Sequence, residues 1–239
     1  LMIRLDGTQN KSKLGANAIL PVSMAICRAG AAADKLSLYQ YISKISGSSV
    51  KVPLASFNFI EGGAHVHRIP TVGGTTAKLD FQEFMVVPPK KSLKENLILA
   101  NKIFLNLQST IKKNYEEDTL MGDEGGFAPK VSKTEQALFL LKNAIGGEDV
   151  KIAIDAAASQ FFKNGKYVLE EKEISRQELI DFYRDLLSRF PIISIEDPFA
   201  QEDWEGFKEI ASELKNVIII GDDLTTTNIK RIKEAKTKN

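Results

Sequence analysis

The chain has 239 residues, of which 43% are hydrophobic and 26% are charged, a globular composition with enough apolar material for one or two domains. The 32 basic and 31 acidic residues leave a formal net charge of +1, which excludes the basic surface typical of proteins that bind nucleic acid or anionic membranes. The single cysteine, Cys27, excludes an internal disulfide and indicates a reducing compartment, and no apolar run approaches the ~20 residues of a membrane-spanning helix.

Residues 1–48 are predicted to be largely helical. Segments 11–33 and 36–45 carry apolar residues at helical spacing. Pro21 lies inside the first segment, and because proline costs roughly 3 kcal/mol in a helix interior, it predicts a kink or a break there. Gly and Ser residues at positions 47–49 are typical of a linker, so the helical region is expected to end at about residue 48.

From about residue 52 the pattern changes to strands that alternate with helices. Continuous apolar runs predict buried strands at residues 54–60, 84–87, 150–154, 192–195 and 217–220. Unbroken hydrophobicity is typical of parallel strands that are covered on both faces. Ser-x-x-Glu capping boxes beginning at Ser92, Ser132 and Ser175 predict three helix starts. This alternation predicts a doubly wound sheet or a (β/α) barrel.

Acidic residues follow three of the predicted strands, at Asp155, Glu196 and Asp222. In parallel α/β folds the carboxyl ends of the strands converge on one face, where the sites lie. Three carboxylates there would repel one another unless a cation held them, and oxygen ligands favour Mg²⁺. Acids after a strand are also common as helix N-caps and turn formers, but their recurrence in successive units favours a metal site.

Two loops carry further candidate residues. Glycines flank Glu124 in residues 122–126, where they allow the backbone to approach a ligand closely. Residues 62–65 read Gly-Gly-Ala-His and open a long loop that holds both histidines of the chain, His65 and His67. Loops of this length are more often functional or disordered than packed. The alternatives are a plain surface turn for the first loop and a mobile insertion for the second.

Four motifs, in order and at suitable spacing, resemble the enolase family. They are residues 5–20, residues 122–129 (Gly-Asp-Glu-Gly-Gly-Phe-Ala-Pro), residues 194–200 (Ser-Ile-Glu-Asp-Pro-Phe-Ala) and residues 221–225 (Gly-Asp-Asp-Leu-Thr). The resemblance implies an α/β fold in two parts. An incomplete enolase-type (β/α) barrel is expected over residues 49–239, preceded over residues 1–48 by the helical part of an α+β N-terminal domain.

The resemblance also implies a role for each candidate residue. The expected ligands of a tightly held Mg²⁺ are Asp155, Glu196 and Asp222. Glu124 corresponds to the general acid, and Glu83 to its partner beside the departing hydroxyl group. His65 corresponds to a mobile-loop histidine that closes over the substrate. Glu83, Glu196 and Asp222 are expected to contact the substrate as well.

The activity implied is the Mg²⁺-dependent dehydration of 2-phosphoglycerate to phosphoenolpyruvate in glycolysis and gluconeogenesis, in the cytoplasm, by an enzyme that is a homodimer at full length. The proton removed is α to a carboxylate, so cations on the carboxylate oxygens stabilise the charge that develops. Hydroxide is a poor leaving group, so a carboxylic acid must protonate it. Neighbouring acids such as Glu83 and Glu124 can keep one proton between them at neutral pH. No nucleic acid or membrane partner is expected.

The chain departs from the family at several points. The catalytic lysine expected on the strand after Asp222, and the substrate-binding residues of later strands, do not occur before Asn239. The chain is therefore expected to be a fragment of a longer enolase and to be inactive alone. Glu61 stands where the family usually has Asn. The stretch after His65 is longer than in typical enolases, which makes His67 an alternative to His65.

Two alternative functions stay open at this point. One is a non-catalytic enolase-like protein with a binding or structural role, which the residue at position 61 and the long histidine loop favour. The other is a different Mg²⁺-dependent barrel enzyme that removes a proton α to a carboxylate, such as a sugar-acid dehydratase or racemase. The set of intact acids argues against the first, and the acidic loop at residues 122–129 argues against the second.

Overall fold

The computed structural model describes residues 1–66, 79–89, 92–115 and 120–238. The chain divides into two compact units, Leu1–Pro53 and Leu54–Asn239. The elements are, in chain order, α1 Met2–Asp6, α2 Ala16–Ala33, α3 Leu38–Ser46, β1 Phe57–Glu61, β2 Glu83–Val87, α4 Leu93–Tyr115, α5 Thr134–Ile145, β3 Lys151–Asp155, β4 Phe162–Lys163, β5 Lys166–Leu169, β6 Lys172–Ile174, α6 Arg176–Arg189, β7 Ile192–Glu196, α7 Trp204–Glu213, β8 Ile218–Ile220, α8 Asp222–Thr225 and α9 Ile229–Lys238, with 3-10 turns η1 Gly63–Val66 and η2 Ala158–Phe161.

The first unit is helical, as its apolar spacing predicts. Helix α2 begins at Ala16 and not at residue 11, because Gly15 precedes it with a φ of 82°, outside the helical region. A kink or a break was expected at Pro21; the helix continues through this residue from Ala16 to Ala33, so it does not break there. A proline removes only one backbone hydrogen bond, and at this position the bond belongs to the second turn, so the remainder of the helix keeps its ladder.

Helix α2 also bears on the expectation about membranes. It is 18 residues long with a mean hydropathy of 1.3, which by length and composition is enough to cross a membrane, and 6% of it is buried. The helix reaches this value because it is rich in alanine and contains one charged residue, Arg28. Core helices of soluble proteins meet the same criterion, so the helix does not by itself indicate a membrane protein.

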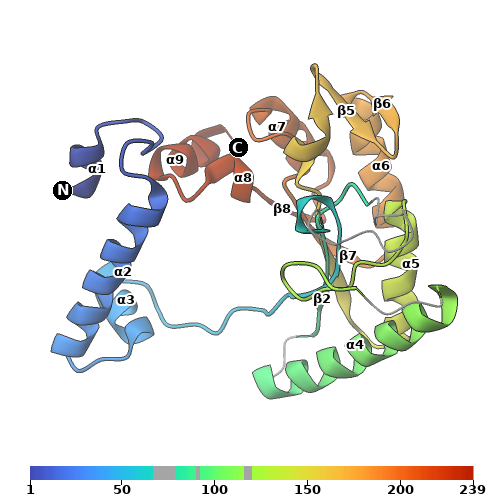
Figure 1. The fold of residues 1–239 in the computed structure, drawn as a ribbon, viewed down its shortest axis with the longest axis horizontal. Coiled ribbons are helices and arrows are strands. Elements are labelled where there is room, and N and C mark those ends of the chain that lie inside the picture. The colour runs from blue at the N-terminus through green and yellow to red at the C-terminus, as the bar shows by residue number, and fades with distance from the viewer. Residues whose placement is uncertain (67–78, 90–91, 116–119, 239) are drawn as a thin grey trace. The chain divides into compact units, whose positions relative to one another are not determined.

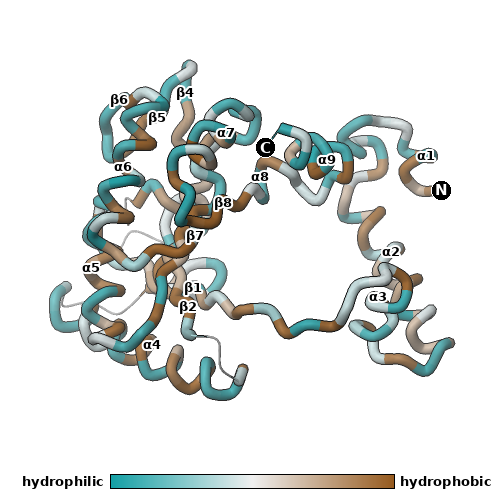
Figure 2. Tube along the Cα trace, turned by 180° about the vertical axis from the view of Figure 1, so that it is seen from behind, coloured by the Kyte–Doolittle hydropathy of each residue, from teal (hydrophilic) through white to brown (hydrophobic). Residues whose placement is uncertain are grey.

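The second unit is built on a five-stranded sheet in the order β1-β2-β3-β7-β8. Strands β3, β7 and β8 are parallel, as predicted, and Figure 2 shows the continuous hydrophobic runs along β7 and β8. The prediction of parallel strands is wrong for β1 and β2, because β2 pairs antiparallel with both of its neighbours. An apolar run shows that a strand is buried but carries no information on its direction.

Helices α4, α5, α6 and α7 follow one another around the outside of this sheet (Figure 1). Among the described residues the sheet does not close on itself, so the architecture is a partial barrel. A second, three-stranded sheet, β4-β5-β6, was not predicted. Its first turn is Asn164–Gly165, with φ values of 52° and 81°, the left-handed backbone that makes Asn-Gly a hairpin signal.

The capping residues place two of the helices as predicted. Ser92 and Ser175 each accept the backbone N–H of the residue three positions later. The box predicted at Ser132 is wrong, because α5 begins at Thr134 and the side chain of Gln136 accepts the backbone N–H of Ser132. The amide oxygen of Gln136 therefore replaces the predicted carboxylate at this helix start.

The hydrophobic core fills the space between the five-stranded sheet and its helices. Its fully buried members include Phe84, Leu107, Leu141, Ile152, Tyr183 and Phe199. The ring centre of Phe81 lies 6.2 Å from that of Phe84 and 6.0 Å from that of Phe161. Close packing of such large side chains holds the neighbouring strand ends at fixed spacings, and these ends carry the acidic residues.

Candidate functional site

A row of four carboxylates crosses one edge of the sheet. Glu61 is paired in register with Glu83, Glu83 with Asp155, and Asp155 with Glu196. Residues directly opposite each other on neighbouring strands project from the same face of a sheet. The register therefore brings together acids from β1, β2, β3 and β7.

Asp222 extends this row on the fifth strand. Ile220, the last residue of β8, pairs with Glu196, and Asp222 follows two residues later as the first residue of α8. The three residues predicted as metal ligands therefore come from the carboxyl ends of three adjacent parallel strands, as the spacing of the sequence predicts.

Burial and mutual repulsion raise the pKa values of the central acids of the row. Asp155 is 6% exposed, and its carboxylate accepts hydrogen bonds from Gln82 Nε2 at 3.1 Å and from the backbone N–H of Ala157 at 2.8 Å. Burial, followed by the charge of Glu196, raises the pKa of Asp155 to about 7. Burial, followed by the charges of Asp197 and Asp222, raises the pKa of Glu196 to about 7.

This donor set suits a hard cation. Within the described part of the chain, no Lys or Arg lies within 4.0 Å of the carboxylates of Asp155, Glu196 or Asp222. The raised pKa values of Asp155 and Glu196, with no Lys or Arg of the described residues beside the three carboxylates, mark a set of oxygens that Mg²⁺ would stabilise. Their oxygens do not all lie within 4.8 Å of one another, whereas those of another group, described below, do; without a cation between them, like charges stay apart.

Asp197 connects the ends of β7 and β8. It is 2% exposed and has a φ of 40°, a left-handed conformation that is costly for a residue with a side chain. Its carboxylate accepts the backbone N–H groups of Asp223 at 2.8 Å and of Leu224 at 3.4 Å, which are the free donors of the first turn of α8. Asp197 thereby fixes the start of α8, and with it Asp222, beside Glu196.

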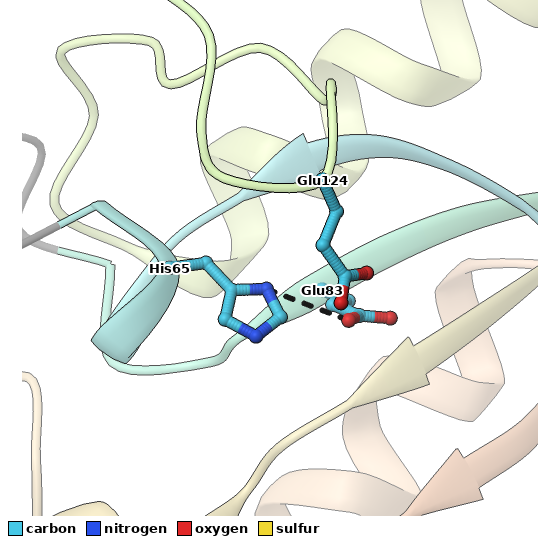
Figure 3. Close-up of side chains that lie close together, drawn as sticks. All are labelled: His65, Glu83 and Glu124. Carbon is cyan, nitrogen blue, oxygen red and sulfur yellow. Dashed lines mark ion pairs between the residues drawn. The ribbon is translucent and has the colours of Figure 1, made fainter. Parts of the chain in front are cut away.

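The predicted acid pair meets at the other end of the row (Figure 3). Glu124 lies in the loop between α4 and α5, and its carboxyl group is hydrogen-bonded to that of Glu83 on β2. Burial, followed by this hydrogen bond and the charge of Glu124, raises the pKa of Glu83 to about 8. The raised pKa of Glu83 keeps a proton on this carboxyl group at neutral pH, beside the carboxyl group of Glu124.

His65 completes this group. It lies in η1, and its Nδ1 atom is 3.5 Å from Oε1 of Glu83 and 3.8 Å from Oε2 of Glu61. His65, Glu83 and Glu124 each offer a ligand atom within 4.8 Å of the others, and Figure 3 shows the three side chains converging from separate elements. His67, the alternative to His65, lies outside the described residues.

Glu61 is the residue of this site whose role was not predicted. Its side chain is fully buried, and its carboxylate accepts backbone N–H groups of the Glu124 loop, from Glu124 at 3.1 Å and from Gly126. The sequence showed it only as a departure from a family pattern. The signal that points to it is the pairing of Glu61 with Glu83, which appears only once strand register is known.

The arrangement combines two chemical capacities on one sheet edge. Oxygen donors gather at Asp155, Glu196 and Asp222 with no Lys or Arg beside them in the part of the chain that the structure describes, and Glu83, whose raised pKa keeps a proton on it at neutral pH, lies beside Glu124. A cation beside a proton donor suits elimination from a carboxylate substrate, because the cation stabilises negative charge on the oxygens while the acid protonates the leaving group.

Comparison with known protein families agrees with this geometry. Residues 49–239 match the family described as enolase, C-terminal TIM barrel domain. Residues 1–42 match the family described as enolase, N-terminal domain. The barrel match alone covers most of the chain and includes every residue of the site, and together the two matches show that this protein belongs to the enolase family.

Proposed function

We propose that the chain acts in the Mg²⁺-dependent dehydration of 2-phosphoglycerate to phosphoenolpyruvate, as part of a longer enolase. The observation that carries the proposal is that the carboxylates of Asp155 and Glu196, which have no Lys or Arg beside them among the described residues, lie on the same sheet edge as the acid pair Glu83 and Glu124. Removal of the α-proton is assigned to a lysine on a later strand of that enolase, as the family resemblance implies.

The metal-holding role falls to the parallel strands. Asp155, Glu196 and Asp222 would hold Mg²⁺, and Glu196 and Asp222 would also lie against the substrate. When bound, Mg²⁺ stabilises the negative charge that develops on the substrate carboxylate. Asp155 is held in orientation by Gln82 and by the backbone N–H of Ala157, and Asp197 sets the position of Asp222 through the start of α8.

The proton-donating role falls to the acid pair. Glu124 is exposed on its loop while Glu83 is half-buried on β2, so Glu124 is the member free to reach the leaving hydroxyl group of a substrate. Glu83 supplies the hydrogen-bond partner that keeps a proton in the pair at neutral pH. His65, 3.5 Å from Glu83, lies where it can contact the substrate beside the pair.

Further parts of the proposal follow from the family. We assign the full-length protein to the cytoplasm as a homodimer. The alternative of a non-catalytic relative was favoured by the unusual residue at position 61. That support is weakened, because Glu61 makes specific hydrogen bonds to the loop that carries Glu124 and so is compatible with an intact acid site.

The experiment measures formation of phosphoenolpyruvate from 2-phosphoglycerate by the enolase that carries these residues, with Mg²⁺ present. We expect Glu124→Gln to lower kcat by roughly 10²- to 10⁴-fold, the usual contribution of a general acid. The matched control is Glu173→Gln on the exposed β5–β6 hairpin, which should turn over normally. Normal turnover by Glu124→Gln would remove this residue from the mechanism. Turnover of unphosphorylated sugar acids in place of 2-phosphoglycerate would overturn the substrate assignment.

A further inference from the structure

The loop that carries Glu124 is folded around the side chain of Glu61. The backbone N–H of Glu124 donates to Glu61 Oε2 at 3.1 Å, and the backbone N–H of Gly126 donates to Glu61 Oε1. Successive N–H groups that converge on one point form a concave site for an anion. Here the anion is supplied by the protein itself.

Glycines line this contact for a steric reason. A Cβ atom at position 126 would lie 2.8 Å from Oε1 and 3.0 Å from Cγ of Glu61, and a Cβ at position 122 would come still closer to Oε2. Neither Gly122 nor Gly126 has the positive φ that would itself demand glycine. The side chain of Glu61 therefore occupies the space that a side chain at either position would need, and at position 126 the backbone of Phe59, 3.2 Å from such a Cβ, limits the space further.

Backbone hydrogen bonds between β1 and the Glu124 loop also hold this loop in place. The N–H of Glu61 donates to the carbonyl of Phe127 at 2.9 Å, and the N–H of Phe127 donates to the carbonyl of Phe59 at 2.8 Å. The loop also closes on itself, because the N–H of Gly122 donates to the carbonyl of Gly126 at 2.8 Å. The end of β1 and the Glu124 loop thus form one hydrogen-bonded unit with the carboxylate of Glu61 at its centre.

We propose that Glu61 is a positioning residue, whose buried carboxylate fixes the Glu124 loop so that the carboxyl group of Glu124 stays against Glu83. The role of Glu61 in catalysis rests on the proposed function. Its effect on the conformation of the Glu124 loop does not depend on that function. A carboxylate has two acceptor oxygens and satisfies both N–H groups. A carboxamide has one acceptor and directs an NH₂ group at the second N–H, so it leaves a buried donor unpaired.

The first experiment measures amide hydrogen exchange, residue by residue, in the 239-residue chain and in its Glu61→Gln variant. We expect the amides of Glu124 and Gly126 to exchange roughly tenfold faster in the variant, the factor that corresponds to the loss of one such hydrogen bond. The amide of Ile152, which donates to the carbonyl of Pro191 at 3.0 Å on the far side of the sheet, is the internal control. Exchange that is unchanged at both loop amides overturns the proposal, and so does exchange that rises equally at all three, since Glu61 would then support only the fold.

A second pair of variants keeps the test independent of the Gln substitution. Gly122→Ala places a methyl group against the carboxylate and should accelerate exchange at Glu124. In a Glu61→Ala background the same Gly122→Ala change should have a smaller effect, because the carboxyl group is gone and only the contact with Cβ of residue 61, at 2.9 Å, remains. Equal effects of Gly122→Ala in the two backgrounds would show that the loop does not depend on Glu61.

The catalytic consequence has its own readout. In the enolase that carries these residues, Glu61→Gln should lower kcat about tenfold and leave KM for 2-phosphoglycerate unchanged, because the side chain of Glu61 is fully buried and is hydrogen-bonded to the loop. A rise in KM with kcat unchanged would contradict a positioning role. If no turnover of 2-phosphoglycerate is found even in the unmodified enolase, the proposed function fails, while the exchange measurements still decide the role of Glu61.

Discussion

The two halves of the five-stranded sheet gather acidic residues in different ways. In the parallel half, β3, β7 and β8 each deliver an acid at or just beyond their carboxyl end, at Asp155, Glu196 and Asp222. In the antiparallel half, β1 delivers Glu61 at its end, but β2 delivers Glu83 as its first residue. Reversing a strand moves the residue at a given sheet edge from its end to its start.

The halves also differ in how they limit repulsion between the acids. The antiparallel half uses groups of the protein, because two backbone N–H groups donate to the side chain of Glu61 and the raised pKa of Glu83 keeps a proton on that group at neutral pH. The parallel half leaves the oxygens of Asp155 and Glu196 without a cationic partner in the described structure. The parallel half therefore has the character of a binding site.

The largest effect should come from removing a proposed ligand in the parallel half. Asp155→Asn withdraws a buried, oriented carboxylate, and we expect Mg²⁺ affinity to fall by more than about 100-fold, beyond the range found for outer-shell partners. Isothermal titration calorimetry measures the change. The matched control is Asp149→Asn, an exposed acid just before the other end of the same strand, which should bind Mg²⁺ like the unmodified chain. Equal binding by both variants would contradict the assignment.

A smaller loss is expected from the residue that connects β7 to α8. Asp197→Asn keeps the size of the side chain but removes one of the two acceptors for the N–H groups of Asp223 and Leu224. We expect Mg²⁺ affinity to fall by roughly 10- to 100-fold, because the start of α8 carries Asp222, a proposed ligand. The same titration tests it. Unchanged affinity would show that Asp222 needs no such support.

A change of pH should alter the thermal stability of the chain through the acids of both halves. The pKa values of Glu83 (about 8), Asp155 (about 7) and Glu196 (about 7) are raised by folding. An acid with a raised pKa stabilises the fold fully below its unfolded pKa, and loses this contribution as pH rises through the folded value. We therefore expect Tm without Mg²⁺ to fall by several degrees between pH 5 and pH 8.

Added Mg²⁺ should raise Tm more at pH 8 than at pH 5, because the metal binds the deprotonated ligands. A Tm that rises over this range without Mg²⁺ would contradict the cited pKa shifts.

The smallest effect is expected from a substitution outside the acidic row, which should not change Mg²⁺ binding. Ser175→Ala removes the N-cap of α6, whose side chain accepts the backbone N–H of Glu178 at 3.3 Å, and we expect it to lower the free energy of unfolding by about 1 kcal/mol. Because α6 carries none of the acids, the stabilisation given by Mg²⁺ should be the same as in the unmodified chain. Denaturant unfolding with and without Mg²⁺ measures both quantities, and a reduced Mg²⁺ effect would show that the site depends on overall stability.

The contrast between the halves also explains what could be predicted from the sequence. Asp155, Glu196 and Asp222 could be located at one sheet edge because parallel strands end on the same side. Glu83 could not be located in this way, since it begins its strand, and only its resemblance to a family position identified it. The role of Glu61 depends on pairing between β1 and a loop about sixty residues away, and no local pattern records such a contact.

The acids of the row lie far apart in the sequence, and this separation affects the folding kinetics. The acidic edge forms only when segments distant in the sequence pair, namely β2 with β3 and β3 with β7, so its loop-closure entropy is high and its contact order large. Each pairing also brings like charges together. The repulsion opposes the final association of the strands, so a protonated edge should fold faster than an ionised one, and a divalent cation added during refolding should have the same effect as acid.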